Sequence, residues 1–284
     1  MGKTCLITGA TAGIGKEAAR ALAAKGFRIV LVSRDRGRGE KARDEMRRSA
    51  AGEPVELIIG DLASQESIRK MAADFESRFD RLDVLINNAG AWYSERTLTI
   101  DGIEATFATN HLAYFLLTGL LTPLLKRSAP SRIVNVASEA HRWARLDFDD
   151  LQGAQSYGGW SAYSKSKLAN IMFTYELARR LEGSGVTANC LHPGTVRTEL
   201  FRNLSGISGA AIKLATVFFR SPKKGAETTV YLASSSDVEG VTGKYFADCK
   251  EARSNEASYD EAGALRLWEM SEQLTHVIAV RPES

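Results

Sequence analysis

Short apolar runs alternate with longer stretches of helical period from the first residues onward. Runs such as KTCLIT and RIVLV are apolar without strict alternation, as expected for strands that are covered on both faces. Strands that alternate with helices are typical of βαβ units and a mostly parallel sheet. The pattern therefore predicts an α/β fold with a doubly wound parallel sheet of about seven strands. The expected strands lie near 3–8, 28–32, 55–59, 82–86, 131–137, 186–191 and 243–247, and the expected helices near 14–25, 36–50, 65–78, 101–125, 161–182, 223–234 and 257–275.

Two segments, 139–160 and 195–221, interrupt this alternation. Both follow expected strands, so both should lie over the carboxyl edge of the sheet, where open α/β sheets bind ligands. No proline-rich linker, internal repeat or low-complexity run divides the chain. We therefore expect one domain over residues 1–276, followed by a short C-terminal tail, 277–284.

Composition is typical of a soluble globular protein, with 44% hydrophobic and 25% charged residues. A net charge of +3 is too small to indicate nucleic-acid binding. The apolar stretch 112–125 contains Thr, Gly and Pro and is shorter than the roughly 20 residues of a membrane span, so we expect a buried helix and no integral membrane segment. The N-terminus resembles a strand rather than a signal peptide, and the three cysteines lie far apart. These features favour a cytoplasmic location with reduced thiols.

A glycine-rich segment, TGATAGIG at 8–15, directly follows the first expected strand and opens the first helix. In that context, glycines allow a tight turn and close approach of the backbone to a pyrophosphate, which the helix N-terminus stabilises. The spacing differs from the common G-x-G-x-x-G, and by itself the segment fits a plain βα turn equally well. The candidate phosphate-binding residues are Gly9, Thr11, Gly13, Ile14 and Gly15.

With its later motifs included, the chain resembles the short-chain dehydrogenase/reductase family over nearly all of its length. The family's markers occur in order: TGATAGIG, then Asp61-Leu62, NNAG at 87–90, Asn110, Ser138, Tyr163-x-x-x-Lys167 and HPG at 192–194. Longer stretches, such as SKSKLANIMFTYELARRL at 164–181 and LHPGTVRTEL at 191–200, resemble the retinol-dehydrogenase-like branch. Many animal members of that branch begin with an apolar membrane anchor. This chain begins differently, so we expect a form without an anchor.

The resemblance implies a single-domain Rossmann-type fold that binds a nicotinamide dinucleotide. It places Asp61 and Leu62 beside the adenine, although Asp61 could also cap a helix over 62–78. It further implies that two segments line the ribose and the nicotinamide end. Their residues are Asn88, Ala89, Gly90, Pro193, Val196 and Thr198.

The end of the second expected strand indicates which dinucleotide binds. NAD enzymes of this fold carry an acidic residue there, which binds the ribose hydroxyls. This chain has Ser33 and Arg34 instead. A serine hydroxyl and a guanidinium can bind a 2′-phosphate that a carboxylate would repel. The sequence therefore favours NADP(H) over NAD(H), although nearby Asp35 leaves a ribose contact open.

Tyr163 and Lys167 are four residues apart in an expected helix and so share one face. A nearby ammonium stabilises a phenolate and lowers the tyrosine pKa from its usual value near 10. Ser138 ends a strand, where its hydroxyl can hydrogen-bond a developing alkoxide. The resemblance gives Asn110 the role of holding a water in a proton relay to the lysine. Each residue alone is usually structural, but the set predicts reversible hydride transfer at a carbonyl or alcohol carbon, with Tyr163 moving the proton.

Five aromatic residues fall in expected loops at the carboxyl edge: Trp92, Tyr93, Trp143, Tyr157 and Trp160. Aromatic residues in loops often only pack the loop down, but five together favour an apolar pocket. We therefore expect a lipophilic aldehyde, ketone or alcohol as substrate. A dinucleotide-sensing regulator and a sugar-nucleotide epimerase or dehydratase are the competing classes. The four histidines lack metal-ligand spacing, so we expect no metal, and a homo-oligomer is left open.

Overall fold

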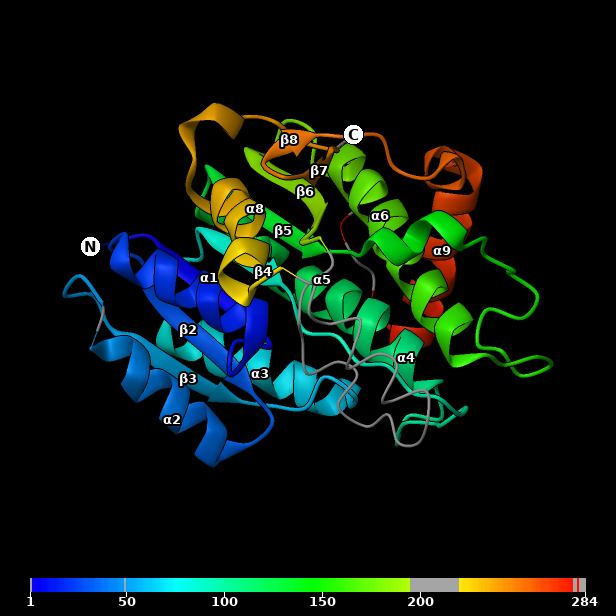
Figure 1. The fold of residues 1–284 in the computed structure, drawn as a ribbon, viewed down its shortest axis with the longest axis horizontal. Coiled ribbons are helices and arrows are strands. Elements are labelled where there is room, and N and C mark those ends of the chain that lie inside the picture. Colours follow the sequence, from blue (N-terminus) through cyan, green and yellow to red (C-terminus); the bar gives the residue numbers. More distant parts are fainter. Residues whose placement is uncertain (1, 49, 195–219, 278–279, 281–284) are drawn as a thin grey trace.

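The computed structural model describes residues 2–48, 50–194, 220–277 and 280, and within them eight strands form one sheet (Figure 1). The strand order is β3-β2-β1-β4-β5-β6-β7-β8. The first seven strands pair in parallel, and β8 pairs antiparallel with β7. The expected doubly wound α/β fold is confirmed, with one additional short strand. The strands are β1 (Thr4–Thr8), β2 (Arg28–Ser33), β3 (Val55–Ile59), β4 (Val84–Asn87), β5 (Ser131–Val136), β6 (Val186–His192), β7 (Tyr245–Ala247) and β8 (Lys250–Glu251).

Helices cover both faces of the sheet (Figure 1). Successive strand side chains point to opposite faces, so Ile7 packs in one hydrophobic cluster and its neighbour Leu6 in another. The first face is covered by α1 (Gly13–Ala24), α2 (Arg36–Arg47) and α8 (Pro222–Ser234). The second is covered by α3 (Gln65–Arg78), α5 (Ala113–Arg127) and α6 (Gly159–Arg180), with α9 (Glu261–Thr275) packed against α6.

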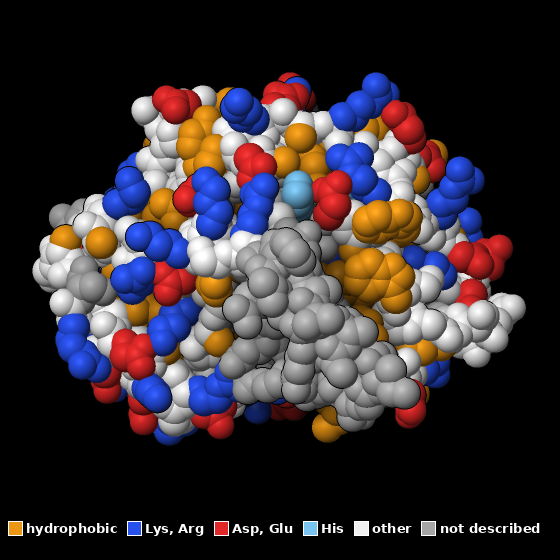
Figure 2. Space-filling view, in the orientation of Figure 1, with side chains coloured by type: hydrophobic (Ala, Val, Ile, Leu, Met, Phe, Trp, Pro, Cys, Tyr) orange, Lys and Arg blue, Asp and Glu red, His pale blue; other side chains and the backbone are white. Residues whose placement is uncertain are grey.

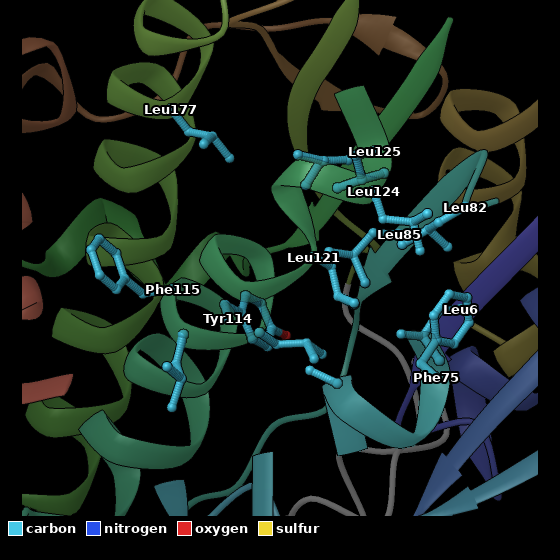
Figure 3. Close-up of a cluster of buried hydrophobic side chains, with 14 of the residues drawn as sticks. Leu6, Phe75, Leu82, Leu85, Tyr114, Phe115, Leu121, Leu124, Leu125 and Leu177 are labelled. Carbon is cyan, nitrogen blue, oxygen red and sulfur yellow. The ribbon is translucent and has the colours of Figure 1, made fainter. Parts of the chain in front are cut away.

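The core on the second face holds α5 against the centre of the sheet. Figure 3 shows Leu6 and Leu85 from β1 and β4 in one cluster with Phe75 from α3 and with Tyr114 and Leu121 from α5. Each of these side chains is almost completely buried. Tightly packed interiors transmit small displacements, so this cluster fixes the start of α5 relative to the carboxyl ends of β1 and β4.

The segment expected as one helix over 101–125 is divided in the structure. A short helix, α4 (Ala105–Phe107), is followed by a π-helical turn, η1 (Ala108–Leu112), and only then by α5. The carboxylate of Glu104 caps α4 by accepting the backbone N–H groups of Thr106 and Phe107 at 2.8 and 2.7 Å. A π-helical turn widens the helix by one residue and is common at functional sites. It changes the direction of the side chains that follow it in α5 relative to those of α4.

The other helices lie close to their expected positions, and some short elements were not expected. Segment 139–160 contains a 3₁₀ helix, η2 (Glu139–Trp143), and the expected helix over 257–275 separates into η6 (Glu256–Tyr259) and α9. One further 3₁₀ turn, η5 (Ser236–Val238), follows α8. Most of segment 195–221 lies outside the described residues. In the described part of the chain, no helix combines the length and the apolar character that crossing a membrane requires.

Candidate active site

The glycine-rich segment is joined to the end of β4 by hydrogen bonds from Thr8 and Asn88. The Thr8 hydroxyl accepts the backbone N–H groups of Asn88 and Ala89 at 2.9 and 3.1 Å. In return, the Asn88 amide donates to the carbonyls of Thr8 and Gly9 at 2.8 and 3.2 Å. Since the strand order reverses between β1 and β4, these bonds lie at the switch point where doubly wound sheets bind ligands.

Three glycines shape this loop for different reasons. A Cβ at Gly9 would lie 2.8 Å from the Cα of Ala89, and one at Gly15 would lie 2.3 Å from the Asn88 amide nitrogen. Gly13 has φ +57 and open space around it. Thr11 is half-buried in the loop, whereas the Ile14 side chain is buried in the core. Gly9 and Gly15 therefore allow the backbone of this loop to lie close to the segment after β4, and the space beside Gly13 is open.

The N-terminus of α1 lacks a capping side chain. Ala12 occupies the N-cap position and gives no side-chain hydrogen bond. By contrast, α2, α3, α8 and α9 each have a capping side chain, from Asp35, Ser64, Ser221 and Asp260. Uncapped N–H groups at a helix N-terminus, next to a glycine loop with open space, form an anion-binding site. The residues present therefore fit the pyrophosphate of a dinucleotide.

At the carboxyl end of β2, Ser33 and Asp35 are engaged within the protein. The Ser33 hydroxyl donates to the Asp35 carbonyl at 2.8 Å, and the Asp35 carboxylate accepts the Arg38 backbone N–H at 2.7 Å. Arg34 is exposed and forms no ion pair within the described part of the chain. The carboxylate that could have bound a ribose thus caps α2, and the guanidinium is the group that faces solvent.

At the end of β3, the expected helix cap lies at a different residue. Helix α3 begins at Gln65, and the hydroxyl of Ser64 caps it by accepting the Ser67 N–H. The alternative that Asp61 caps a helix over 62–78 is therefore wrong, because the helix spans Gln65–Arg78, as its hydrophobic pattern predicted, and Ser64 is its N-cap. The exposed Asp61 carboxylate accepts the Ala63 N–H at 3.0 Å. Leu62 is partly buried against the core.

The expected proton-transfer residues lie together at the carboxyl end of β5. The Ser138 hydroxyl is close enough to the Tyr163 phenol to lower its pKa. The ammonium nitrogen of Lys167 lies 5.8 Å from the centre of the Tyr163 ring and donates to the Val136 carbonyl at 3.1 Å. Tyr163 and Lys167 come from α6, and Ser138 directly precedes η2. Residues from two separate segments are thus brought into one group.

The electrostatics of this group differ from the sequence-based expectation. Burial raises the pKa of Tyr163 above its usual value, and the nearby Ser138 hydroxyl opposes that rise only in part. Burial also lowers the pKa of Lys167 to about 7. We expected Lys167 to lower the tyrosine pKa. The net direction is upward because desolvation penalises the buried phenolate, and because an ammonium with a pKa near neutrality is only partly charged.

Asn110 lies on the π-helical turn and is completely buried. Its Oδ1 accepts the Ala91 N–H at 2.7 Å, and its Nδ2 donates to the Ala91 carbonyl and to the Ser166 hydroxyl, both at 2.9 Å. Both amide donors are therefore used, and one lone pair on Oδ1 can still accept a water. A Cβ at Gly90 would lie 3.6 Å from this oxygen and 3.5 Å from the Lys167 nitrogen. Asn110 and Lys167 thus flank the same exposed glycine.

Three further side chains support the group, and the sequence analysis missed all of them as candidates. Tyr114 donates its hydroxyl to the Ala89 carbonyl at 2.7 Å, and its ring centre lies 5.7 Å from the Lys167 nitrogen. Ser166 donates to the Tyr163 carbonyl at 2.7 Å, and Thr8 holds the end of β4. Helical spacing could have found two of them, since Tyr114 follows Asn110 by four residues and Ser166 follows Tyr163 by three.

Among the five aromatic residues expected to line a substrate pocket, some are exposed near Tyr163 and others are packed within a loop. Trp143 and Trp160 are 70% and 49% exposed. Their ring centres are 6.4 Å apart, and that of Trp160 is 5.9 Å from Tyr163. Figure 2 shows hydrophobic side chains gathered on this face of the molecule, over α6 and the segment after β5. A series of rings therefore leads from solvent to Tyr163.

Tyr157 instead packs its loop down. Its hydroxyl donates to the Tyr93 carbonyl at 3.1 Å and lies 3.2 Å from the Glu104 carboxylate. Trp92 and Tyr93 are partly buried on the segment after Gly90, and Pro193 directly follows β6. Val196 and Thr198 lie outside the described residues. Among the residues that are described, no three His, Cys, Asp or Glu side chains gather as a metal site.

Comparisons with known proteins identify the family of this chain. A family model described as short chain dehydrogenase matches residues 3–206. Retinol dehydrogenase 14 of Mus musculus is 46% identical, over 98% of this chain and 87% of its own length. A crystal structure of a protein from Mycobacterium paratuberculosis is 34% identical with a TM-score of 0.78, covering 97% of this chain and 94% of that chain.

A second solved structure contains a dinucleotide. RhlG of Pseudomonas aeruginosa, solved with NADP, is 25% identical with a TM-score of 0.70, over 86% of this chain and 94% of its own. The family match covers most of the chain, and the retinol dehydrogenase match extends over nearly all of it. The chain therefore belongs to the short-chain dehydrogenase/reductase family of oxidoreductases and is similar to its retinol dehydrogenases.

Proposed function

We propose that this protein catalyses reversible hydride transfer between NADP(H) and the carbonyl or alcohol carbon of a lipophilic aldehyde, ketone or alcohol. The observation that carries the proposal is the grouping of Ser138, Tyr163 and Lys167 at one sheet edge. This edge also holds the glycine loop and the uncapped N-terminus of α1. A proton-transfer group and an anion-binding turn are the two parts that such a reaction requires.

We assign candidate residues to each part of the dinucleotide. The N-terminus of α1 would hold the pyrophosphate, and Arg34 the 2′-phosphate, by charge-assisted hydrogen bonds. When bound, the dinucleotide supplies or accepts the hydride. The residues that would surround its other parts are Asp61 and Leu62 at the adenine, Asn88, Ala89, Gly90, Tyr163 and Lys167 at the nicotinamide ribose, and Pro193, Val196 and Thr198 at the nicotinamide end.

The protein's own part in the reaction is to move and hold a proton. In reduction, Tyr163 donates its phenolic proton to the substrate oxygen, while the Ser138 hydroxyl hydrogen-bonds the developing alkoxide. The raised pKa of Tyr163 keeps that proton in place at neutral pH. In oxidation, a phenolate takes the proton, and both the Ser138 hydroxyl and a charged Lys167 stabilise that phenolate.

The substrate class follows from the rings beside Tyr163. Exposed Trp143 and Trp160 offer apolar area to a bound molecule, at roughly 25 cal/mol per Å² before ordering costs. The relatives of this chain include retinol dehydrogenases, and retinol is a lipophilic alcohol, which supports the same class. We also place the protein in a reducing compartment such as the cytoplasm, because Cys5, Cys190 and Cys249 are free thiols.

The test is oxidation of NADPH, followed by its absorbance, with a panel of carbonyl compounds. The panel contains lipophilic, short aliphatic, sugar-like and charged members. We expect turnover that is fastest with the lipophilic members. A regulator, or an epimerase that recycles its cofactor internally, would bind NADPH without consuming it, and that result would overturn the proposed function.

A further inference from the structure

A histidine joins the segment that carries Ser138 to the end of β6. His192 ends β6, and its side chain is only 16% exposed. Its Nδ1 accepts the backbone N–H of Gly194 at 3.1 Å, and its Nε2 lies 3.1 Å from Oε2 of Glu139. Glu139 directly follows Ser138 and begins η2. One imidazole therefore bridges the segment that carries Ser138 and the turn that leaves β6.

This geometry specifies the tautomer of the imidazole. A nitrogen that accepts an N–H carries no proton, so in the neutral ring the proton is on Nε2 and faces Glu139. The Oε2 atom of Glu139 is buried and accepts no hydrogen bond among the described residues, so the Nε2 atom of His192, 3.1 Å away, is its close contact. The second oxygen of that carboxylate is bound by the Arg142 guanidinium. Accepting the Gly194 N–H on Nδ1 requires the neutral Nε2–H form of His192.

Gaining a second proton would break this arrangement. Nδ1 would then carry a hydrogen that points at the Gly194 N–H, so two donors would face each other. Burial lowers the pKa of His192 below its usual value, although neighbouring carboxylates oppose that shift, so the ring is neutral at pH 7. The groups that face His192 come from three elements: Glu139, His141 and Arg142 from η2, Tyr245 and Asp248 from β7 and the turn after it, and Arg220 before α8.

The turn that His192 holds has a restricted backbone. Gly194 has φ +78, in the left-handed region, and a Cβ there would lie 2.9 Å from the Arg220 side chain. Arg220 is itself ion-paired with Asp248, through its NH2 at 3.0 Å. Only glycine fits this position, and the hydrogen bond to His192 fixes the direction of its N–H.

We propose that His192, oriented by Glu139, is a positioning residue that fixes the Pro193–Gly194 backbone relative to Ser138 and thereby sets the nicotinamide end of the dinucleotide site. The proposal rests on the proposed function for the identity of the ligand. It adds that one neutral imidazole joins the two segments that follow the paired residues of β5 and β6. Neither His192 nor Glu139 touches the reacting atoms in this role.

Two amide variants separate the two contacts of the ring. His192→Asn places an amide oxygen near the position of Nδ1, so it keeps an acceptor for Gly194 and cannot titrate. His192→Gln places its amide near Nε2, so it keeps the contact with Glu139 and loses the one with Gly194. The readout is the dissociation constant of NADP⁺, measured by titration calorimetry, with circular dichroism to verify folding. We expect the Gln variant to bind about tenfold more weakly at pH 7.5 and the Asn variant within about twofold of wild type.

The pH dependence of binding adds a readout that a purely structural role would not change. Between pH 7.5 and 5.5, wild type should lose affinity more steeply than His192→Asn, because only wild type gains a proton on the ring. Ionisation of the ligand phosphate is common to both proteins and cancels in the comparison. Glu139→Gln should move the loss to lower pH, since the carboxylate that favours the charged ring is gone. Exposed His276, at the C-cap of α9, provides the control His276→Asn, which should titrate like wild type.

Equal dissociation constants of NADP⁺ for wild type and His192→Gln would overturn the positioning role. The same result would follow if the NADP⁺ affinity of His192→Asn fell with decreasing pH as steeply as that of wild type. In both cases the proposed function would stand, because wild type still binds NADP⁺. Failure of wild type itself to bind NADP⁺ would overturn the proposed function and the positioning role together.

Discussion

Asn110 binds the backbone of Ala91 in both directions, accepting its N–H at 2.7 Å and donating to its carbonyl at 2.9 Å. Ala91 directly follows the NNAG segment, and Asn110 sits on the π-helical turn before α5. The asparagine therefore fastens the loop after β4 to the helix beside it. The same amide also reaches Ser166 on α6. One side chain thus joins three segments around Gly90.

Replacing Asn110 should destabilise the fold as well as the site. Asn110→Ala leaves both Ala91 backbone groups without their partner, so the free energy of unfolding should fall by about 2 kcal/mol or more. Ser166→Ala removes one hydrogen bond of the same amide, together with the Ser166 bond to the Tyr163 carbonyl, leaves both Ala91 contacts intact, and should cost about 1 kcal/mol. Urea unfolding of both variants measures the difference. Equal losses would show that the Ala91 contacts contribute little.

Stability should depend on the ionisation of Lys167. Its pKa is about 7 in the folded protein, against a usual value of 10.5. Between these pH values the unfolded chain binds a proton that the folded protein lacks, so the free energy of unfolding rises with pH across the window and falls as pH drops towards 7. Lys167→Met lacks this dependence. In urea unfolding at a series of pH values, the free energy of unfolding of wild type should increase relative to that of Lys167→Met from about pH 7 to 10.5. A difference in free energy that stays constant with pH would mean that buried Lys167 keeps its proton.

Arg34 should determine the preference for NADPH. Asp35 caps α2, so the exposed guanidinium of Arg34 is the group available to a 2′-phosphate. Arg34→Ala should lower the ratio of kcat/KM for NADPH to that for NADH by about tenfold, chiefly through KM. Arg266→Ala, at an exposed position on α9, is the matched control and should leave the ratio unchanged. An unmodified enzyme that uses both cofactors equally would contradict the assignment.

The two exposed tryptophans should differ in their effect on bulky substrates. The Trp160 ring lies next to Tyr163, whereas that of Trp143 lies one ring further out. Trp160→Ala should raise KM for a bulky apolar carbonyl by about tenfold, Trp143→Ala by less, and neither should do so for a short aldehyde. Ile100→Ala removes another exposed apolar side chain and serves as the control. Uniform effects on large and small substrates would indicate that these rings only pack the loop.

Strong local patterns made the parallel sheet and most helices predictable. The prediction of one helix over 101–125 was wrong because a π-helical turn does not change the spacing of hydrophobic residues in a recognisable way. The continuous apolar stretch Leu112–Leu125 also gives no indication that a separate short helix begins after Glu104. The two residues of β8 are too few to form a pattern. Motif order indicated Ser138, Tyr163 and Lys167, but their pKa directions depend on burial by distant segments. The Ala91 contact and the His192 bridge are tertiary and could not be found from spacing.

Proton transfer by Tyr163 is the central claim, and the most direct measurement is turnover by Tyr163→Phe with dinucleotide affinity measured on the same preparation. The substitution removes the transferable proton and leaves the glycine loop and α1 unchanged. We expect kcat to fall by a factor of about 1000 with a lipophilic carbonyl, while the dissociation constant of NADP⁺ changes by less than about threefold. Turnover near the wild-type rate in the phenylalanine variant would contradict the account.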